Sequence, residues 1–190
     1  MKNKGFWGMV LIAVLATGVN SAFAQRSREI HFRGTLSDYT PQTSSPGGPW
    51  EVRGQWSLTI KRDGKADFSA AVNMERSDLG VMNSGGGDLN NPADRNAHTH
   101  HLKLKDGTVT ALSNGIEITG GVVTITANGG WPPPFEPPGS GLKIDIVGGN
   151  TVTFSNIKVT FLGGAQTHFG MAPLSGVVRR VREGEEWNER

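Results

Sequence analysis

The sequence has no cysteine among its 190 residues. This absence excludes disulfide bonds, thiolate nucleophiles, iron–sulfur clusters and cysteine-ligated zinc. The sequence also lacks the stripe of basic residues typical of nucleic-acid binding, because its lysines and arginines are scattered apart from a short run near the C-terminus. Nucleic acid is therefore not expected as a partner, and the fold must be held together by its core.

Neither positive nor negative residues predominate in most of the chain. The formal charge is +2, from 19 basic and 17 acidic residues. Lys2 and Lys4 precede an apolar run over 9–19, which Ala22-Phe23-Ala24 follows. This is the pattern of an export signal, so we expect cleavage after Ala24. The mature chain would then have 166 residues (190 less 24), with 17 basic and 17 acidic residues and no net charge.

Long hydrophobic runs are also scarce. The apolar part of the expected signal is too short to favour a membrane anchor, and no later segment is long enough to span a bilayer. We therefore expect a mature protein without a membrane span, located in the periplasm or outside the cell. Residues 25–178 are enough for one well-buried domain, and residues 179–190 are expected to form a charged tail.

The mature sequence consists of short alternating segments rich in Val, Ile, Thr and Phe, separated by glycine-containing turns. Apolar residues alternate along 52–60 and again along 68–74, and Asp63-Gly64 lies between the two runs. Two alternating runs around Asp-Gly predict a β-hairpin. Similar segments occur at 30–36, 98–105, 108–112, 115–119, 121–127, 144–146, 152–154, 157–161 and, less regularly, 167–178.

This spacing predicts an all-β domain, a single antiparallel β-barrel of roughly 8–10 strands. A β-sandwich is the alternative, since it has the same alternation. We favour a barrel because consecutive hairpins close most simply in that way. Two further turns are expected: Lys105-Asp106-Gly107-Thr108 would end the strand over 98–105, and Gly148-Gly149-Asn150 would join 144–146 to 152–154.

The most informative segment is 97–105, which reads Ala-His-Thr-His-His-Leu-Lys-Leu-Lys. Alternate side chains of a strand share a face, so His98 and His100 would share theirs with Leu102 and Leu104, while His101 would lie opposite. The leucines should be buried, so two imidazoles should point into the domain. A buried polar group costs about 1–3 kcal/mol unless it is hydrogen-bonded or coordinated. The two histidines therefore need a metal, a ligand or a polar network.

Two histidines separated by one residue on a strand lie about 6.5–7 Å apart and can reach one metal ion. His168 would be a third ligand, contributed by the last strand. A divalent transition metal is the cofactor that such a set would hold. The other interpretation needs no metal: His98 and His100 would hydrogen-bond within the barrel mouth or line a ligand pocket.

Two segments interrupt the strands. Residues 77–96 are rich in Gly, Asn and Asp, lead into His98 and are expected to form a loop at the barrel mouth. Residues 129–139 are rich in proline, which favours a stiff extended path. Trp131 and Phe135 in this segment would either close one end of the barrel or contact a ligand.

The predicted architecture is similar to that of small-molecule barrels such as the lipocalin-like and allene-oxide-cyclase-like folds. Gly54-Gln55-Trp56 has the spacing of the lipocalin Gly-x-Trp motif, but it lies in the second predicted strand and no matching C-terminal signature follows. The resemblance concerns the fold alone and transfers no catalytic residue to this chain.

Three functions are compatible with these features. The first is an exported β-barrel that binds a small apolar ligand, with His98, His100, Trp131 and Phe135 as ligand-binding residues. The second is an enzyme. It would be either a cyclase or isomerase with histidines as acid and base, or a metal-dependent enzyme that uses His98, His100 and His168. The third is a structural or interaction role for the surface.

Overall fold

The computed structural model describes residues 28–40, 49–76, 98–128, 139–148 and 156–183. Strands make up most of this part of the chain. In chain order the elements are β1 (Ile30–Thr40), β2 (Trp50–Ile60), β3 (Lys65–Arg76), β4 (His98–Leu112), β5 (Gly115–Thr119), β6 (Val122–Asn128), β7 (Gly141–Val147), β8 (Asn156–Leu162), the 3₁₀ turn η2 (Gly163–Ala165), α3 (Gln166–Phe169) and β9 (Leu174–Glu183).

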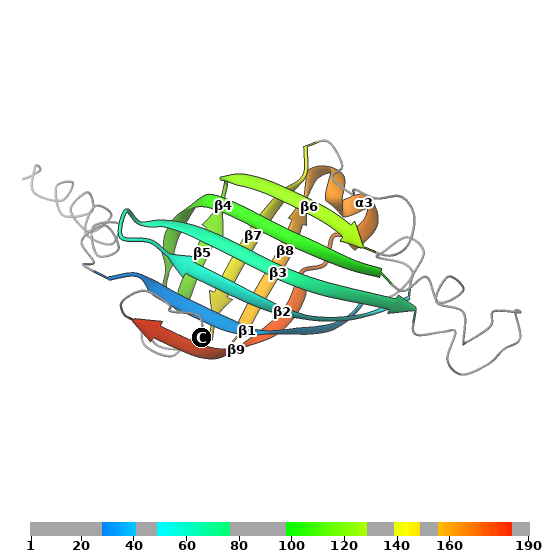
Figure 1. The fold of residues 1–190 in the computed structure, drawn as a ribbon, viewed down its shortest axis with the longest axis horizontal. Helices are drawn as coiled ribbons and strands as arrows, with labels where there is room; N and C mark the ends of the chain where they lie inside the picture. Colours follow the sequence, from blue (N-terminus) through cyan, green and yellow to red (C-terminus); the bar gives the residue numbers. More distant parts are fainter. Residues whose placement is uncertain (1–27, 41–48, 77–97, 129–138, 149–155, 184–190) are drawn as a thin grey trace, which may run out of the picture.

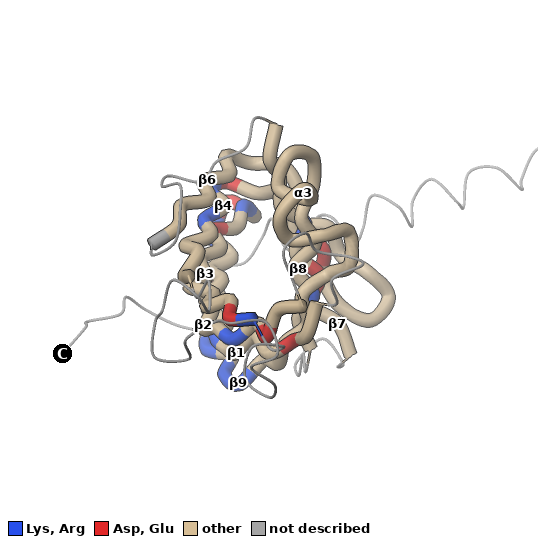
Figure 2. Tube along the Cα trace, turned by 90° about the vertical axis from the view of Figure 1, so that its right-hand side faces the viewer, with Lys and Arg blue, Asp and Glu red and all other residues tan. Residues whose placement is uncertain are grey.

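The predicted antiparallel β-barrel is confirmed. In spatial order the strands run β3-β2-β1-β9-β8-β7-β5-β4, and β4 pairs back with β3. Eight strands therefore close into a ring, and β6 adds a ninth strand against β4. This closure distinguishes the fold from a sandwich, and Figure 2 shows the ring from one end. Within the described ranges, no helix is long and apolar enough to cross a membrane.

The strands form because their sequences alternate. Along β3, Phe68, Ala70, Val72 and Met74 are buried, and the residues between them lie on the outer face. The expected hairpin of β2 and β3 is present, and Gly64 takes a φ of 79° in its turn. Glycine adopts such a backbone without strain because it has no Cβ atom.

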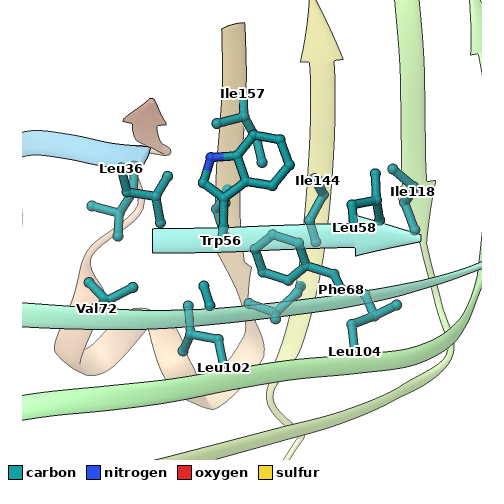
Figure 3. Close-up of a cluster of buried hydrophobic side chains, with 14 of the residues drawn as sticks. Leu36, Trp56, Leu58, Phe68, Val72, Leu102, Leu104, Ile118, Ile144 and Ile157 are labelled. Atoms are coloured by element: carbon teal, nitrogen blue, oxygen red, sulfur yellow. The ribbon is translucent and has the colours of Figure 1, made fainter. Parts of the chain in front are cut away.

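One contiguous hydrophobic cluster occupies the barrel interior (Figure 3). Trp56 is 3% exposed, as its alternation predicts, and its ring stacks on Phe68 with centroids 6.4 Å apart. Gly34, opposite Trp56 on β1, leaves room for the indole. A Cβ atom at Gly34 would collide with the indole ring and with the backbone oxygen of Val177. This glycine therefore permits close packing where β1 meets β9.

The turn predicted at Asp106-Gly107 is wrong. The strand continues to Leu112, and the Asp-Gly pair lies in a β-bulge of β4. Three steps on β4, from Leu104 to Gly107, lie opposite two steps on β3, from Phe68 to Ala66. Asp106 takes a φ of 57° in the bulge.

Polar contacts from β3 and from the β2–β3 turn hold this bulge. The backbone N–H of Asp106 donates to Oδ1 of Asp67 at 2.9 Å. Nζ of Lys61 lies 2.6 Å from Oδ1 of Asp106 and 2.8 Å from Oδ1 of Asp67. A local Asp-Gly signal therefore marks positive φ correctly, but long-range contacts make the site a bulge rather than a turn.

The bulge marks the point where β4 changes partners. Residues 99–105 pair with β6, whereas residues 108–112 pair with β5 on the same edge. Elsewhere on the ring, η2 contacts β7 and α3 contacts β8. Figure 1 shows α3 at the end of the barrel where β6 ends.

The last segment differs from the expected strand over 167–178. Residues 166–169 form the short helix α3, so His168 comes from a helix and not from a strand. Gly170 follows the helix with a φ of 82°, and its N–H donates to the carbonyl of Gln166 at 3.0 Å. β9 then pairs with β1 and β8 and continues to Glu183, into the range that the sequence assigned to a tail.

Several predictions concern parts of the chain outside the described residues. These are the export signal, the loop over 77–96 and most of the proline-rich segment, including Trp131 and Phe135. The expected partner of β7 over 152–154 also lies there. Within the described residues β7 pairs with β8, which begins at Asn156.

Replacing Gly34 with alanine tests the packing at the β1–β9 contact. Because the added methyl group collides with Trp56 and with backbone, we expect Gly34→Ala to lower the free energy of unfolding by about 2–3 kcal/mol. Gly141→Ala is the matched control, since its Cβ would meet only the side chain of Leu162, at 3.3 Å, and should change stability by about 0.5 kcal/mol or less. Urea unfolding measures both, and equal stability of the two variants would contradict this account of Gly34.

Candidate metal centre

The alternation of β4 places two imidazoles inside the barrel, as predicted. His98 is 8% exposed and His100 is 1% exposed, and they share the inner face with the fully buried Leu102 and Leu104. His101 lies on the opposite face and is partly exposed. The strand that carries the pair is held on both edges, by β3 and by β6, so the two rings start from a fixed backbone.

A third imidazole approaches from the far side of the barrel mouth. His168 is on α3, and the next residue, Phe169, anchors that helix. The Phe169 ring stacks on Phe161 of β8 with centroids 3.8 Å apart and planes only 5° apart. Phe169 is 1% exposed, so burial of this ring fixes the neighbouring histidine over β4.

The three rings converge on one point. Nε2 of His168 lies 3.1 Å from Nε2 of His98 and 3.0 Å from Nε2 of His100. One ring nitrogen from each histidine lies within 4.8 Å of the other two. In a tetrahedral zinc site with Zn–N bonds of about 2.0–2.1 Å, the ligand nitrogens are about 3.3 Å apart. Both distances to Nε2 of His168 are close to the spacing that such an ion imposes.

The two contacts of His168 share one ring nitrogen. A neutral imidazole nitrogen has either one N–H or one lone pair in the ring plane. One N–H or one lone pair at Nε2 of His168 therefore serves both His98 and His100. A cation that accepts one lone pair from each ring would satisfy all three at once.

Aromatic side chains surround the three histidines. The ring of Trp50, at the start of β2, meets the edge of His98 with centroids 5.2 Å apart and lies 6.2 Å from His168. Phe169 lies 4.7 Å from His100 and 5.0 Å from His168. Because Trp50 is 1% exposed, these rings exclude water from one side of the centre.

This environment keeps two of the imidazoles neutral. Burial lowers the pKa of His100 to about 3, and repulsion from the rings of His168 and His98 adds to the effect. A backbone hydrogen bond to Thr126 acts in the opposite direction. Burial and the nearby His98 lower the pKa of His168 to about 4. Neutral imidazole is the form that binds metal ions, so at neutral pH both rings are ready as ligands.

The structure brings together the whole metal set predicted from sequence, His98, His100 and His168. Trp131 and Phe135, predicted as ligand contacts, lie outside the described residues. Within the described ranges no carboxylate joins the three histidines. Asp67 pairs with Lys61 and Glu117 pairs with Lys143, so these two carboxylates are engaged elsewhere.

Sequence reasoning missed the part that Trp50 and Phe169 play in the centre. Trp50 begins β2 and is buried against two of the histidines, His98 and His168. The available signal for Phe169 was its position next to His168. The contact that matters, with Phe161, joins two elements and leaves no local pattern.

The depressed pKa values predict an acid-sensitive fold. The unfolded chain protonates these histidines near pH 6.5, whereas the folded protein resists protonation until about pH 4 for His168 and about pH 3 for His100. The unfolded state thus binds more protons, so stability of the metal-free protein should fall as pH decreases from 6.5 to 5, by up to about 1.4 kcal/mol per pH unit for each group. Urea unfolding across this range should show a shallower slope for His100→Leu, and an unchanged slope would contradict the prediction.

Comparison with protein-family models, curated proteins and solved structures finds no match to this chain. No relative therefore supplies a function. A barrel fold does not define an activity, so the function has to be argued from the three histidines and their surroundings.

Proposed function

We propose that this barrel binds a transition-metal ion through His98, His100 and His168. The observation that carries the proposal is the convergence of three ring nitrogens, with His168 only 3.0–3.1 Å from each partner. Burial of His98 and His100 supports it, because burial favours the neutral imidazole, which is the form that binds a metal ion.

The chemistry of the ligands favours a borderline or soft ion. Imidazole nitrogen suits zinc, copper, nickel and iron, whereas magnesium and calcium prefer oxygen ligands. The chain has no cysteine, so thiolate ligation does not compete. Zinc is a suitable first probe because it has no redox chemistry, and cobalt can replace it as a spectroscopic reporter.

Two other hypotheses receive less support. An apolar ligand inside the barrel would have to share the interior with a buried hydrophobic cluster. This cluster includes Trp56 and Phe68, whose rings stack on each other. Acid–base chemistry works best when the catalytic pKa lies near the working pH. The pKa of His100, about 3, and that of His168, about 4, are far from neutrality.

Metal binding would join two distant parts of the chain. His168 lies 70 residues from His98 and 68 residues from His100 in sequence. An ion held by all three would tie α3 to β4 across the barrel mouth. Because the ion binds the folded state, it should raise the free energy of unfolding, by about 2.7 kcal/mol when its free concentration is 100 times its Kd.

Metal titration of protein purified without a histidine tag tests the proposal. We expect one equivalent of Zn²⁺ to bind, as measured by calorimetry and by metal analysis after gel filtration. His100→Ala should lower the affinity at least about 100-fold, because it removes one of three ligands. His101→Ala, on the outer face of the same strand, should bind zinc as the unmodified protein does. Failure of the unmodified protein to bind, or equal loss in both variants, would refute the proposal.

We also propose that the protein is exported, on the evidence of the charged start, the apolar run and the Ala22-Phe23-Ala24 site. Expression of the full chain in a bacterial host should give a secreted or periplasmic product that begins at Gln25. Mass spectrometry of the purified protein measures the new N-terminus, and an intact Met1 in a cytoplasmic product would contradict the proposal.

A further inference from the structure

Met74 lies directly beside the histidine centre. It pairs with His98 in the β3–β4 register, and it is fully buried on the inner face of the barrel. Cross-strand partners on one face have Cβ atoms about 4.5–5.5 Å apart. The Cβ atom of Met74, from which its thioether extends, therefore lies next to that of His98.

Trp50 encloses this position from the other side. Met74 pairs with Val52 of β2, and Trp50 lies two residues before Val52 on the same strand. The Trp50 ring nevertheless meets His98 on β4, so it reaches across β3, the strand that carries Met74. A methionine enclosed between β2 and β4 in this way is shielded from water. Its unbranched side chain has three rotatable bonds, which let the sulfur turn toward a neighbouring ion.

The charge of the centre favours a monovalent ion. Imidazole binds a metal ion in its neutral form, and within the described residues no carboxylate joins the group. The ion would therefore keep its full charge in a largely buried, aromatic environment. The cost of removing an ion from water rises with the square of its charge, so a singly charged ion pays roughly one quarter of the cost of a doubly charged one of equal size.

Resting on the metal-binding function proposed above, we propose that the centre is selective for Cu(I) and that the Met74 thioether is its fourth ligand. Thioether and imidazole ligands together suit Cu(I), which is soft, better than Zn²⁺. Because the chain has no cysteine, methionine is the only residue type that can offer sulfur to a metal.

X-ray absorption of the Cu(I)-loaded protein tests the ligand assignment without any substitution. The protein is loaded anaerobically with one equivalent of Cu(I), prepared with ascorbate as reductant. We expect three nitrogen scatterers and one sulfur scatterer in the first shell. A first shell of nitrogen and oxygen alone would overturn the assignment of Met74.

Met74→Leu measures the contribution of the sulfur, since the exchange nearly conserves volume and should preserve the fold. We expect it to lower Cu(I) affinity at least tenfold, in competition with a chromophoric chelator, while Zn²⁺ affinity changes less than threefold. Met171→Leu is the matched control, because Met171 is 77% exposed. It should leave both affinities unchanged.

The outcomes separate the two proposals. Zinc binding through the histidines, with equal Cu(I) affinity in the unmodified protein and Met74→Leu, would overturn the copper inference and leave the metal-binding function standing. Absence of binding for both ions in the unmodified protein would overturn both. Equal losses of zinc and copper affinity in Met74→Leu would show that Met74 acts through packing, and would also overturn its role as a ligand.

Discussion

The two-residue period of β4 is the constraint on which the rest of the structure depends. Because alternate side chains share a face, the strand that buries Leu102 and Leu104 also buries His98 and His100. Once the two imidazoles are inside, desolvation disfavours their charged forms and makes partners necessary. His168 on α3 contacts both imidazoles, and the three ring nitrogens together could hold a metal ion.

Hydrophobic packing positions the polar centre. α3 has only four residues and is too short to be stable on its own. The stack of Phe169 on Phe161 holds it against β8, and Trp50 packs on the histidines from β2. The barrel therefore uses ordinary aromatic burial to place groups that would otherwise prefer water.

Much of the fold could be predicted from local sequence. The alternation of 52–60 and 68–74, and the Asp63-Gly64 turn, identified the β2–β3 hairpin, and the parity of 98–104 identified the two buried histidines. The features that could not be predicted depend on contacts between distant residues. A four-residue helix has too little length for periodicity, so the helical position of His168 left no signal. The bulge at Asp106 depends on Lys61 and Asp67, which lie 45 and 39 residues away.

That bulge also changes which residues of β4 face the barrel interior. Before it the even-numbered residues face inward, as His98, His100 and Leu104 do, and after it the inward positions are odd-numbered, as at Gly107 and Val109. Because of the extra residue, β4 can pair with both β6 and β5. Its even-numbered residues lie opposite the inward residues of β6, and its odd-numbered residues lie opposite the inward residues of β5. If one residue were deleted at this point, the same alternation of inward and outward side chains would continue along the whole of β4. The strand would then have to turn either its imidazole pair or its junction with β5 away from the interior.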